Sequence, residues 1–239
     1  PDCPCYVEYD LDVIFVVDVG CGISEEECND QVEGVSEYLV NIKRDASPRT
    51  GLIYYGNPGS PTTKITLTDS EFNDLSSPPG SILDKRLELA QRIRLEGQPI
   101  CAAVDGQSPS TDGLDAAITE AINQLTTNDI LEDGEYRQKK IVIISNCKQD
   151  NESGLCTDYG RIDINGREVE VTVINMVNNN APAGPEPLSD SDADTYLKCL
   201  TENDPYRFYK VPDITHDEIQ DIVSDFWMEI CEQPTKDPT

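Results

Sequence analysis

The chain has 239 residues, with 46 acidic and 18 basic side chains and a formal net charge of −28. This length suffices for one large α/β domain with a proper core. The charge argues against binding to nucleic acid or to an anionic membrane, because phosphates would meet a like-charged surface. No apolar run approaches the roughly 18–20 residues that cross a bilayer. The chain begins at Pro1 without a charged-then-apolar leader, so we expect a mature or excised chain.

Nine cysteines are a high count for this length. They form no paired CxxC spacing, and the single histidine, His216, has no ligand partner at metal spacing. Disulfides formed in an oxidising compartment explain the cysteines better than a metal does. Asn151 begins the glycosylation sequon Asn-Glu-Ser. We therefore expect a secreted or cell-surface glycoprotein.

Strand patterns begin with the nearly unbroken apolar run Leu11–Asp18, which ends in a carboxylate and is typical of a strand buried on both faces. Further strands are predicted at 51–56, 64–68, 141–144, 169–174 and 206–211, with turns at 57–61 and at Asn165-Gly166.

Helices are predicted between these strands. Ser24, followed by three glutamates, is an N-cap, and Thr215 opens a capping box. Apolar residues at helical spacing predict helices from residue 25 to about 42 and over 82–95, 111–125, 189–200 and 215–230. Strands that alternate with helices predict a single α/β domain with a doubly wound, mostly parallel central sheet flanked by helices.

The order of several segments resembles the von Willebrand factor type A (vWA) domain family. The segments are 12–18, 51–55, Ser110-Thr111-Asp112-Gly113, 140–146 and 208–211. The resemblance covers residues 10–231, which leaves a Cys-rich flank at 1–9 and a tail at 232–239. It implies a Rossmann-like sheet that binds protein or matrix ligands at the carboxyl ends of its strands.

Many members of this family hold a divalent cation with an Asp-x-Ser-x-Ser loop, a Thr from a second loop and an Asp from a third. The matching positions here are Asp18, Gly20, Gly22, Ser110 or Thr111, and Asn146. The two glycines offer no side-chain oxygen and Asn146 is neutral, whereas Mg²⁺ requires nearly ideal octahedral oxygen coordination. We therefore predict a degenerate metal site, no bound cofactor, and at most weak Ca²⁺ or Mg²⁺ binding.

All nine cysteines are disulfide candidates: Cys3, Cys5, Cys21, Cys28, Cys101, Cys147, Cys156, Cys199 and Cys231. Cys21–Cys28 and Cys147–Cys156 would close local loops. The resemblance implies that the termini lie close together, so Cys3 or Cys5 would pair with Cys231. Because nine is odd, one cysteine is free or bonds another chain.

Asp190, Asp192 and Asp194 resemble the start of a calcium loop, but Thr195 and Thr201 replace its glycine and its last glutamate, so helix capping is the better interpretation. His216 is interpreted as a surface helix residue, which argues against Ser-His and Cys-His catalysis.

The sequence thus predicts a non-catalytic extracellular interaction domain that acts in adhesion or in assembly of a matrix or filament. Its partner would be an extracellular protein, a matrix component or another copy of itself. The alternative is a metal-dependent adhesion receptor, in which Asp18, Ser110 or Thr111, and Asn146 hold Mg²⁺, Mn²⁺ or Ca²⁺ and a ligand carboxylate binds the ion. A carboxylate-based hydrolase is a third class, but no pair of acidic residues stands out.

Overall fold

The computed structural model describes residues 11–19, 24–41, 49–56, 62–67, 79–102, 113–127, 137–145, 159, 161–176, 197–202, 204 and 207–211. The expected flanks at 1–9 and 232–239 and the helix predicted at 215–230 lie outside these residues. Of the helix predicted at 189–200, only the end from Leu197 is described, and it finishes as the short 3₁₀ helix η1 (Cys199–Thr201).

The described secondary structure alternates between strands and helices. The strands are β1 (Leu11–Asp18), β2 (Arg49–Tyr55), β3 (Thr62–Ile65), β4 (Gln138–Ser145), β5 (Ile162–Ile164), β6 (Arg167–Met176) and β7 (Phe208–Val211). The α-helices are α1 (Glu25–Asn41), α2 (Pro79–Ala102) and α3 (Leu114–Thr127). The strand predicted at 64–68 is instead β3, which begins two residues earlier and ends at Ile65.

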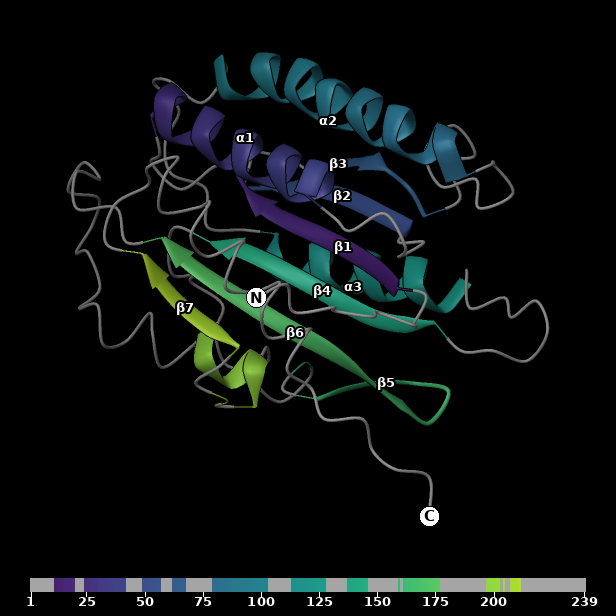
Figure 1. Ribbon diagram of the computed structural model, residues 1–239. Coiled ribbons are helices and arrows are strands. Elements are labelled where there is room, and N and C mark those ends of the chain that lie inside the picture. Colours follow the sequence, from purple (N-terminus) through teal and green to yellow (C-terminus); the bar gives the residue numbers. More distant parts are fainter. Residues whose placement is uncertain are drawn as a thin grey trace, which may run out of the picture.

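The strands form a seven-stranded sheet in the order β3-β2-β1-β4-β6-β5, with β7 also paired to β6 (Figure 1). β2, β1, β4, β6 and β7 are parallel, and β3 and β5 pair antiparallel with their neighbours. This confirms the prediction of a mostly parallel α/β sheet. β1 and β4 lie in the middle, which explains why their sequences are apolar on both faces.

Helices cover both faces of this sheet, with α1 and α2 together on one side and α3 on the other (Figure 1). Side chains alternate along a strand, so Ile14 and Val16 of β1 face α3. The core on that side joins buried residues of β1, β2, β4 and β6 to Leu114, Ala117, Ile118, Ala121 and Leu125 of α3.

α1 and α2 are joined by a disulfide between Cys28 and Cys101, both fully buried. The expected Cys21–Cys28 bridge is therefore wrong. Cys28 lies on the side of α1 that faces α2, and its sulfur meets a cysteine 73 residues away in sequence. The helices also approach closely at Gly97, where an added Cβ would lie 2.6 Å from Val32 Cγ1.

Candidate functional site

Polar residues end three neighbouring parallel strands at one edge of the sheet. Asp18 ends β1, Ser145 ends β4, and Asn175 lies near the end of β6; they are 2 %, 0 % and 3 % exposed. Ser145 pairs with Asn175, and the preceding pair Val17–Ile144 places Asp18 beside Ser145. All three side chains lie on the face of the sheet that α3 covers, because they alternate in step with the core residues of their strands. A buried row of one carboxylate, one hydroxyl and one amide therefore lies at the carboxyl edge.

The next strand and the start of α3 adjoin this row. Tyr55, the last residue of β2, pairs with Asp18, and its carbonyl accepts a hydrogen bond from the Val19 amide at 2.9 Å. Gly56 and Gly113 have φ angles of +91° and +122°, which favour glycine. A Cβ on Gly113 would lie 3.7 Å from Tyr55 Cβ, so the residue before α3 sits directly against the end of β2.

Tyr159 attaches the chain after β4 to the first turns of α3. Its hydroxyl donates a hydrogen bond to Asp115 Oδ1 at 2.5 Å and lies 2.7 Å from Thr119 Oγ1. The ring also packs against the core on this side of the sheet.

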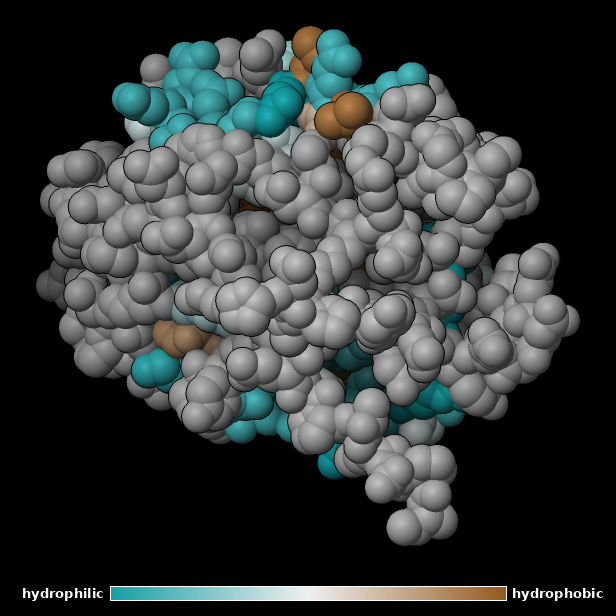
Figure 2. Space-filling view, viewed as in Figure 1, coloured by the Kyte–Doolittle hydropathy of each residue, from teal (hydrophilic) through white to brown (hydrophobic). Residues whose placement is uncertain are grey.

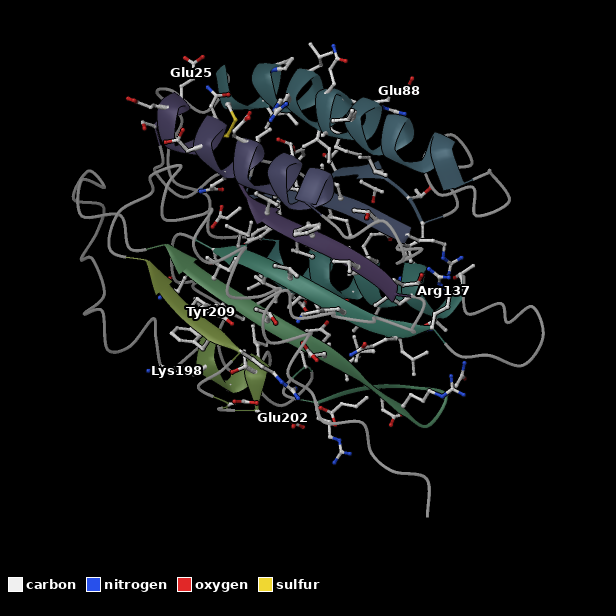
Figure 3. The ribbon with its side chains drawn as sticks, viewed as in Figure 1. Glu25, Glu88, Arg137, Lys198, Glu202 and Tyr209 are labelled. Atoms are coloured by element: carbon white, nitrogen blue, oxygen red, sulfur yellow. A yellow bond between two sulfur atoms is a disulfide. The ribbon has the colours of Figure 1, made fainter. Side chains whose placement is uncertain are left out.

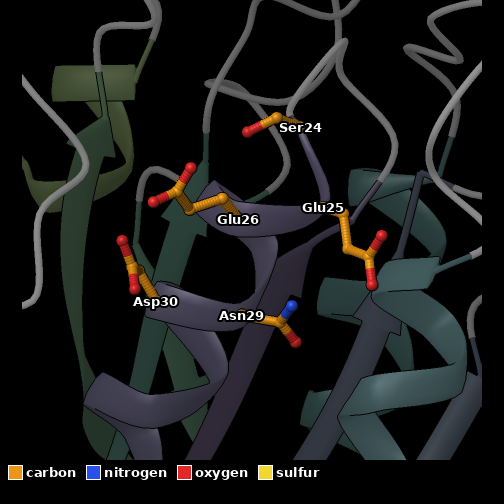
Figure 4. A pocket seen from close by; sticks show the side chains of 5 residues that line it. All are labelled: Ser24, Glu25, Glu26, Asn29 and Asp30. Carbon is orange, nitrogen blue, oxygen red and sulfur yellow. The ribbon is translucent and has the colours of Figure 1, made fainter.

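The amino end of α1 provides an acidic rim at the same edge, because α1 follows β1 in the chain. Glu25 lies here, whereas Arg137, just before β4, lies at the opposite end of the sheet (Figure 3). Five residues line an open pocket of about 500 Å³: Ser24, Glu25, Glu26, Asn29 and Asp30 (Figure 4). Three carboxylates and no basic side chain line it, so a neutral or basic ligand group is favoured there.

The residues expected to hold a metal are described only in part. Asp18 occupies the predicted position at the edge, but Gly20, Gly22, Ser110, Thr111 and Asn146 lie outside the described residues. Among those that are described, no group of three or more His, Cys, Asp or Glu side chains could hold a metal ion. One carboxylate with neutral oxygens is a poor donor set for a tightly bound Mg²⁺, which requires six well-placed ligands.

Ser145 and Asn175 are site residues that the sequence interpretation did not single out. Ser145 has a signal in the sequence, since it is the first polar residue after the apolar run 141–144, as Asp18 is after the run 13–17. Asn175 has a weaker one, because the strand before it also contains Glu170 and Thr172. Parallel strands end at a shared edge, which brings such residues together.

Three cysteines are seen in disulfides, since Cys199 is bonded as well as Cys28 and Cys101. The other candidates, Cys3, Cys5, Cys21, Cys147, Cys156 and Cys231, lie outside the described residues, as do Asn151 and His216. In the part of the chain that the structure covers, no helix has both the length and the apolarity to cross a lipid bilayer.

Solved structures provide the comparison for this fold. The pilus adhesin SpaC of Lactobacillus rhamnosus GG aligns over 94 % of this chain and 31 % of its own, with 10 % identity and a TM-score of 0.54. Proximal thread matrix protein 1 from the mussel byssus, with a zinc-occupied MIDAS motif, aligns over 91 % and 48 %, with 11 % identity and a TM-score of 0.58. The ArnB paralog VWA2 from Sulfolobus acidocaldarius aligns over 90 % and 44 %, with 14 % identity and a TM-score of 0.51.

The fold is that of the vWA domain. The chain spans less than half the length of each of these three proteins. No protein-family model and no curated protein sequence matches it. The vWA fold places Asp18, Ser145 and Asn175 at the strand ends, as the resemblance implied for Asp18.

Proposed function

We propose that this vWA-fold chain is a non-catalytic, extracellular interaction domain that acts in adhesion or in assembly of a matrix or filament. Its binding surface is the carboxyl edge of the sheet together with the acidic rim at the start of α1. The partner is an extracellular protein or matrix component. Contacts there do not require a bound Mg²⁺.

The observation that carries this proposal is the composition of the edge. The row of Asp18, Ser145 and Asn175 contains a single carboxylate, and the neighbouring loop has glycine at positions 20 and 22. The carboxyl edge of a parallel sheet is where α/β folds bind ligands. A pilus adhesin and a byssus thread protein share the fold, which supports a role in adhesion or assembly. Disulfides support an oxidising compartment.

The alternative is a metal-dependent receptor, and it also has support. Asp18 is retained, Ser145 adds a hydroxyl beside it, and the mussel protein has zinc in its MIDAS motif. Calorimetry with MgCl₂, MnCl₂ and ZnCl₂ distinguishes the two. We expect that no metal ion binds the natural chain with saturable 1:1 stoichiometry, and that the Asp18→Ala variant gives the same weak heat of titration as the natural chain. Tight binding that Asp18→Ala abolishes would establish the receptor instead.

Binding to immobilised insoluble extracellular matrix tests the surface directly. We expect binding to persist in EDTA and to fall at least about tenfold in a Glu25→Lys/Glu26→Lys variant, because two of the three carboxylates that line the rim pocket are replaced by positive charges. The matched control is Glu168→Lys/Glu202→Lys, which makes the same charge change on exposed residues away from the edge. Equal loss in the control would contradict a specific role for the rim.

A further inference from the structure

The turn between β5 and β6 carries the one Asn-Gly pair in the sequence, Asn165-Gly166. Glycine after an asparagine gives the most reactive context for the asparagine side chain, because no Cβ hinders attack by the glycine nitrogen. Both residues are exposed, and a Cβ added to Gly166 would meet no atom of the described chain within 4 Å. The turn lies at the amino end of β6, away from the carboxyl edge (Figure 1), and hydrophilic atoms are open to solvent in this part of the same view (Figure 2). Water and hydroxide therefore reach the pair.

Deamidation at this pair needs only water as a co-reactant. The nitrogen of Gly166 forms a bond to Asn165 Cγ, the bond from Cγ to Nδ2 breaks, and Nδ2 leaves as ammonia together with the former amide proton of Gly166. Water then opens the cyclic imide at one of its two carbonyl carbons. One product is aspartate, and the other is isoaspartate, whose backbone is one carbon longer. The rate depends on how readily the Gly166 nitrogen gives up its proton and reaches Cγ.

Asp163 holds this nitrogen in the folded hairpin. The Gly166 amide donates a hydrogen bond to Asp163 Oδ1 at 2.8 Å. A carboxylate that accepts the amide proton stabilises the protonated amide and opposes the formation of a negative nitrogen beside it. Pairing across the hairpin does not account for Asp163, because its partner on β6 is Glu168 and like charges directly opposite each other are destabilising. The favourable contribution of Asp163 to the hairpin is therefore its hydrogen bond to the turn.

We propose that Asn165 is a deamidation site, and that the hydrogen bond from the Gly166 amide to Asp163 slows its reaction for as long as the hairpin is closed. The reaction needs no enzyme, so modified chains accumulate with age. The inference goes beyond the proposed function and does not depend on it.

The two products have different consequences for β5. Isoaspartate lengthens the backbone of a two-residue turn, so Ile164 and Arg167 no longer pair directly beside it. In the described sheet β5 pairs only with β6, and its buried Ile162 and Ile164 then lose their places in the core. Aspartate keeps the backbone length and tolerates a positive φ angle, so it leaves the hairpin closed. Urea denaturation of the separated products should show the isoaspartate form to be the less stable.

Mass spectrometry of the full chain, aged at mildly alkaline pH, tests the site. Trypsin cleaves after Arg161 and Arg167 and releases Asn165 in the short peptide 162–167, in which aspartate and isoaspartate are separated by chromatography. We expect Asn165 to react faster than Asn123, an exposed asparagine of α3 that precedes Gln124. It should also react more slowly in the folded chain than in the same chain unfolded in urea. A folded chain in which Asn165 reacts no faster than Asn123, or as fast as in urea, would overturn the proposal.

Substitution of Asp163 tests the hydrogen bond. Folded Asp163→Ala should deamidate at least about threefold faster than the natural chain, because a hydrogen bond to a charged acceptor is lost. Asp163→Asn keeps an oxygen acceptor without the charge and should react at an intermediate rate. The matched control, Glu168→Ala, removes the carboxylate opposite Asp163, leaves the bond to Gly166 intact, and should react at the natural rate.

Two further measurements separate the hydrogen bond from an opened hairpin or a sequence effect. Amide hydrogen exchange of β5 and β6 reports opening of the hairpin, and it should change less than the rate of deamidation in Asp163→Ala. Unfolded in urea, Asp163→Ala and the natural chain should react at the same rate. An unchanged rate in folded Asp163→Ala, an equal rise in Glu168→Ala, or a rise matched by the loss of exchange protection would each overturn the role of Asp163.

Discussion

Asp12 is the buried acid on which the amino-terminal edge of the sheet depends. It is fully buried and accepts hydrogen bonds from Arg49 Nε and Nη2 at 2.8 Å and 2.6 Å and from Arg137 Nε at 2.6 Å. Asp12 belongs to β1, Arg49 to β2, and Arg137 directly precedes β4, so one carboxylate holds three segments together. Removing one member of a buried ion pair leaves an uncompensated charge.

Asp12→Ala is therefore expected to lower the free energy of unfolding by about 3–5 kcal/mol. Urea denaturation followed by circular dichroism measures this loss. The control is Glu168→Ala, which removes an exposed carboxylate 3.3 Å from Arg207 and should cost at most about 1 kcal/mol. Equal losses of unfolding free energy in the two variants would show that the burial of Asp12 adds nothing to stability.

At the scale of elements, the packing of α1 against α2 depends on a missing side chain at Gly97. An added Cβ there would lie 2.6 Å and 2.8 Å from the two γ-carbons of Val32, closer than real side chains approach. Glycine normally weakens a helix interior. Here it allows the two helices to lie close enough for the disulfide between them.

Gly97→Ala should lower the free energy of unfolding by about 1–3 kcal/mol because the helices must move apart. In a Val32→Ala background the same substitution should cost less than about 1 kcal/mol, since both γ-carbon contacts are gone and only the Cβ of residue 32, 3.2 Å from the added Cβ, must give way. The double-mutant cycle is measured by urea denaturation. Additive effects of the two substitutions would contradict a direct contact.

For the whole molecule, the net charge of −28 opposes compaction. We expect the free energy of unfolding to rise by about 1 kcal/mol or more between about 10 mM and about 300 mM NaCl, because the Debye length falls from about 30 Å to about 6 Å. Thermal or urea unfolding at each salt concentration gives the value. MgCl₂ at matched ionic strength should stabilise the natural chain and Asp18→Ala equally; a larger effect on the natural chain would indicate a cation bound at Asp18.

The sequence predicts the buried strands of the fold better than it predicts the helix ends. Apolar runs locate β1 and β4 because a strand buried on both faces leaves a continuous signal. The turn at Asn165-Gly166 is confirmed, with φ angles of +56° and +81°. β5 was not predicted, because three residues are too short to show a period. α2 extends past the predicted end at residue 95 because its packing on α1 outweighs Gly97 and Pro99.

In the candidate site, too, some features can be predicted from the sequence and others cannot. Asp18 is predictable because a carboxylate ends an apolar strand. The pairing of Cys28 with Cys101 cannot be predicted in this way, since it depends on which side of α1 faces α2. The short sequence spacing favoured Cys21 as the partner of Cys28 instead. The end of an apolar run marks Ser145, but its place beside Asn175 depends on strand register, which the sequence does not reveal.

The Cys28–Cys101 bond has a consequence for how the molecule is built during synthesis. The stretch it encloses contains β2, β3 and the greater parts of α1 and α2, so residues 28–101 become a covalent ring that leaves β1 outside. A chain growing from its amino end holds everything needed to close that ring before β4 emerges. β1 then presents one unoccupied edge, on which β4 pairs when it emerges, and β6, which is translated later, pairs in turn with β4.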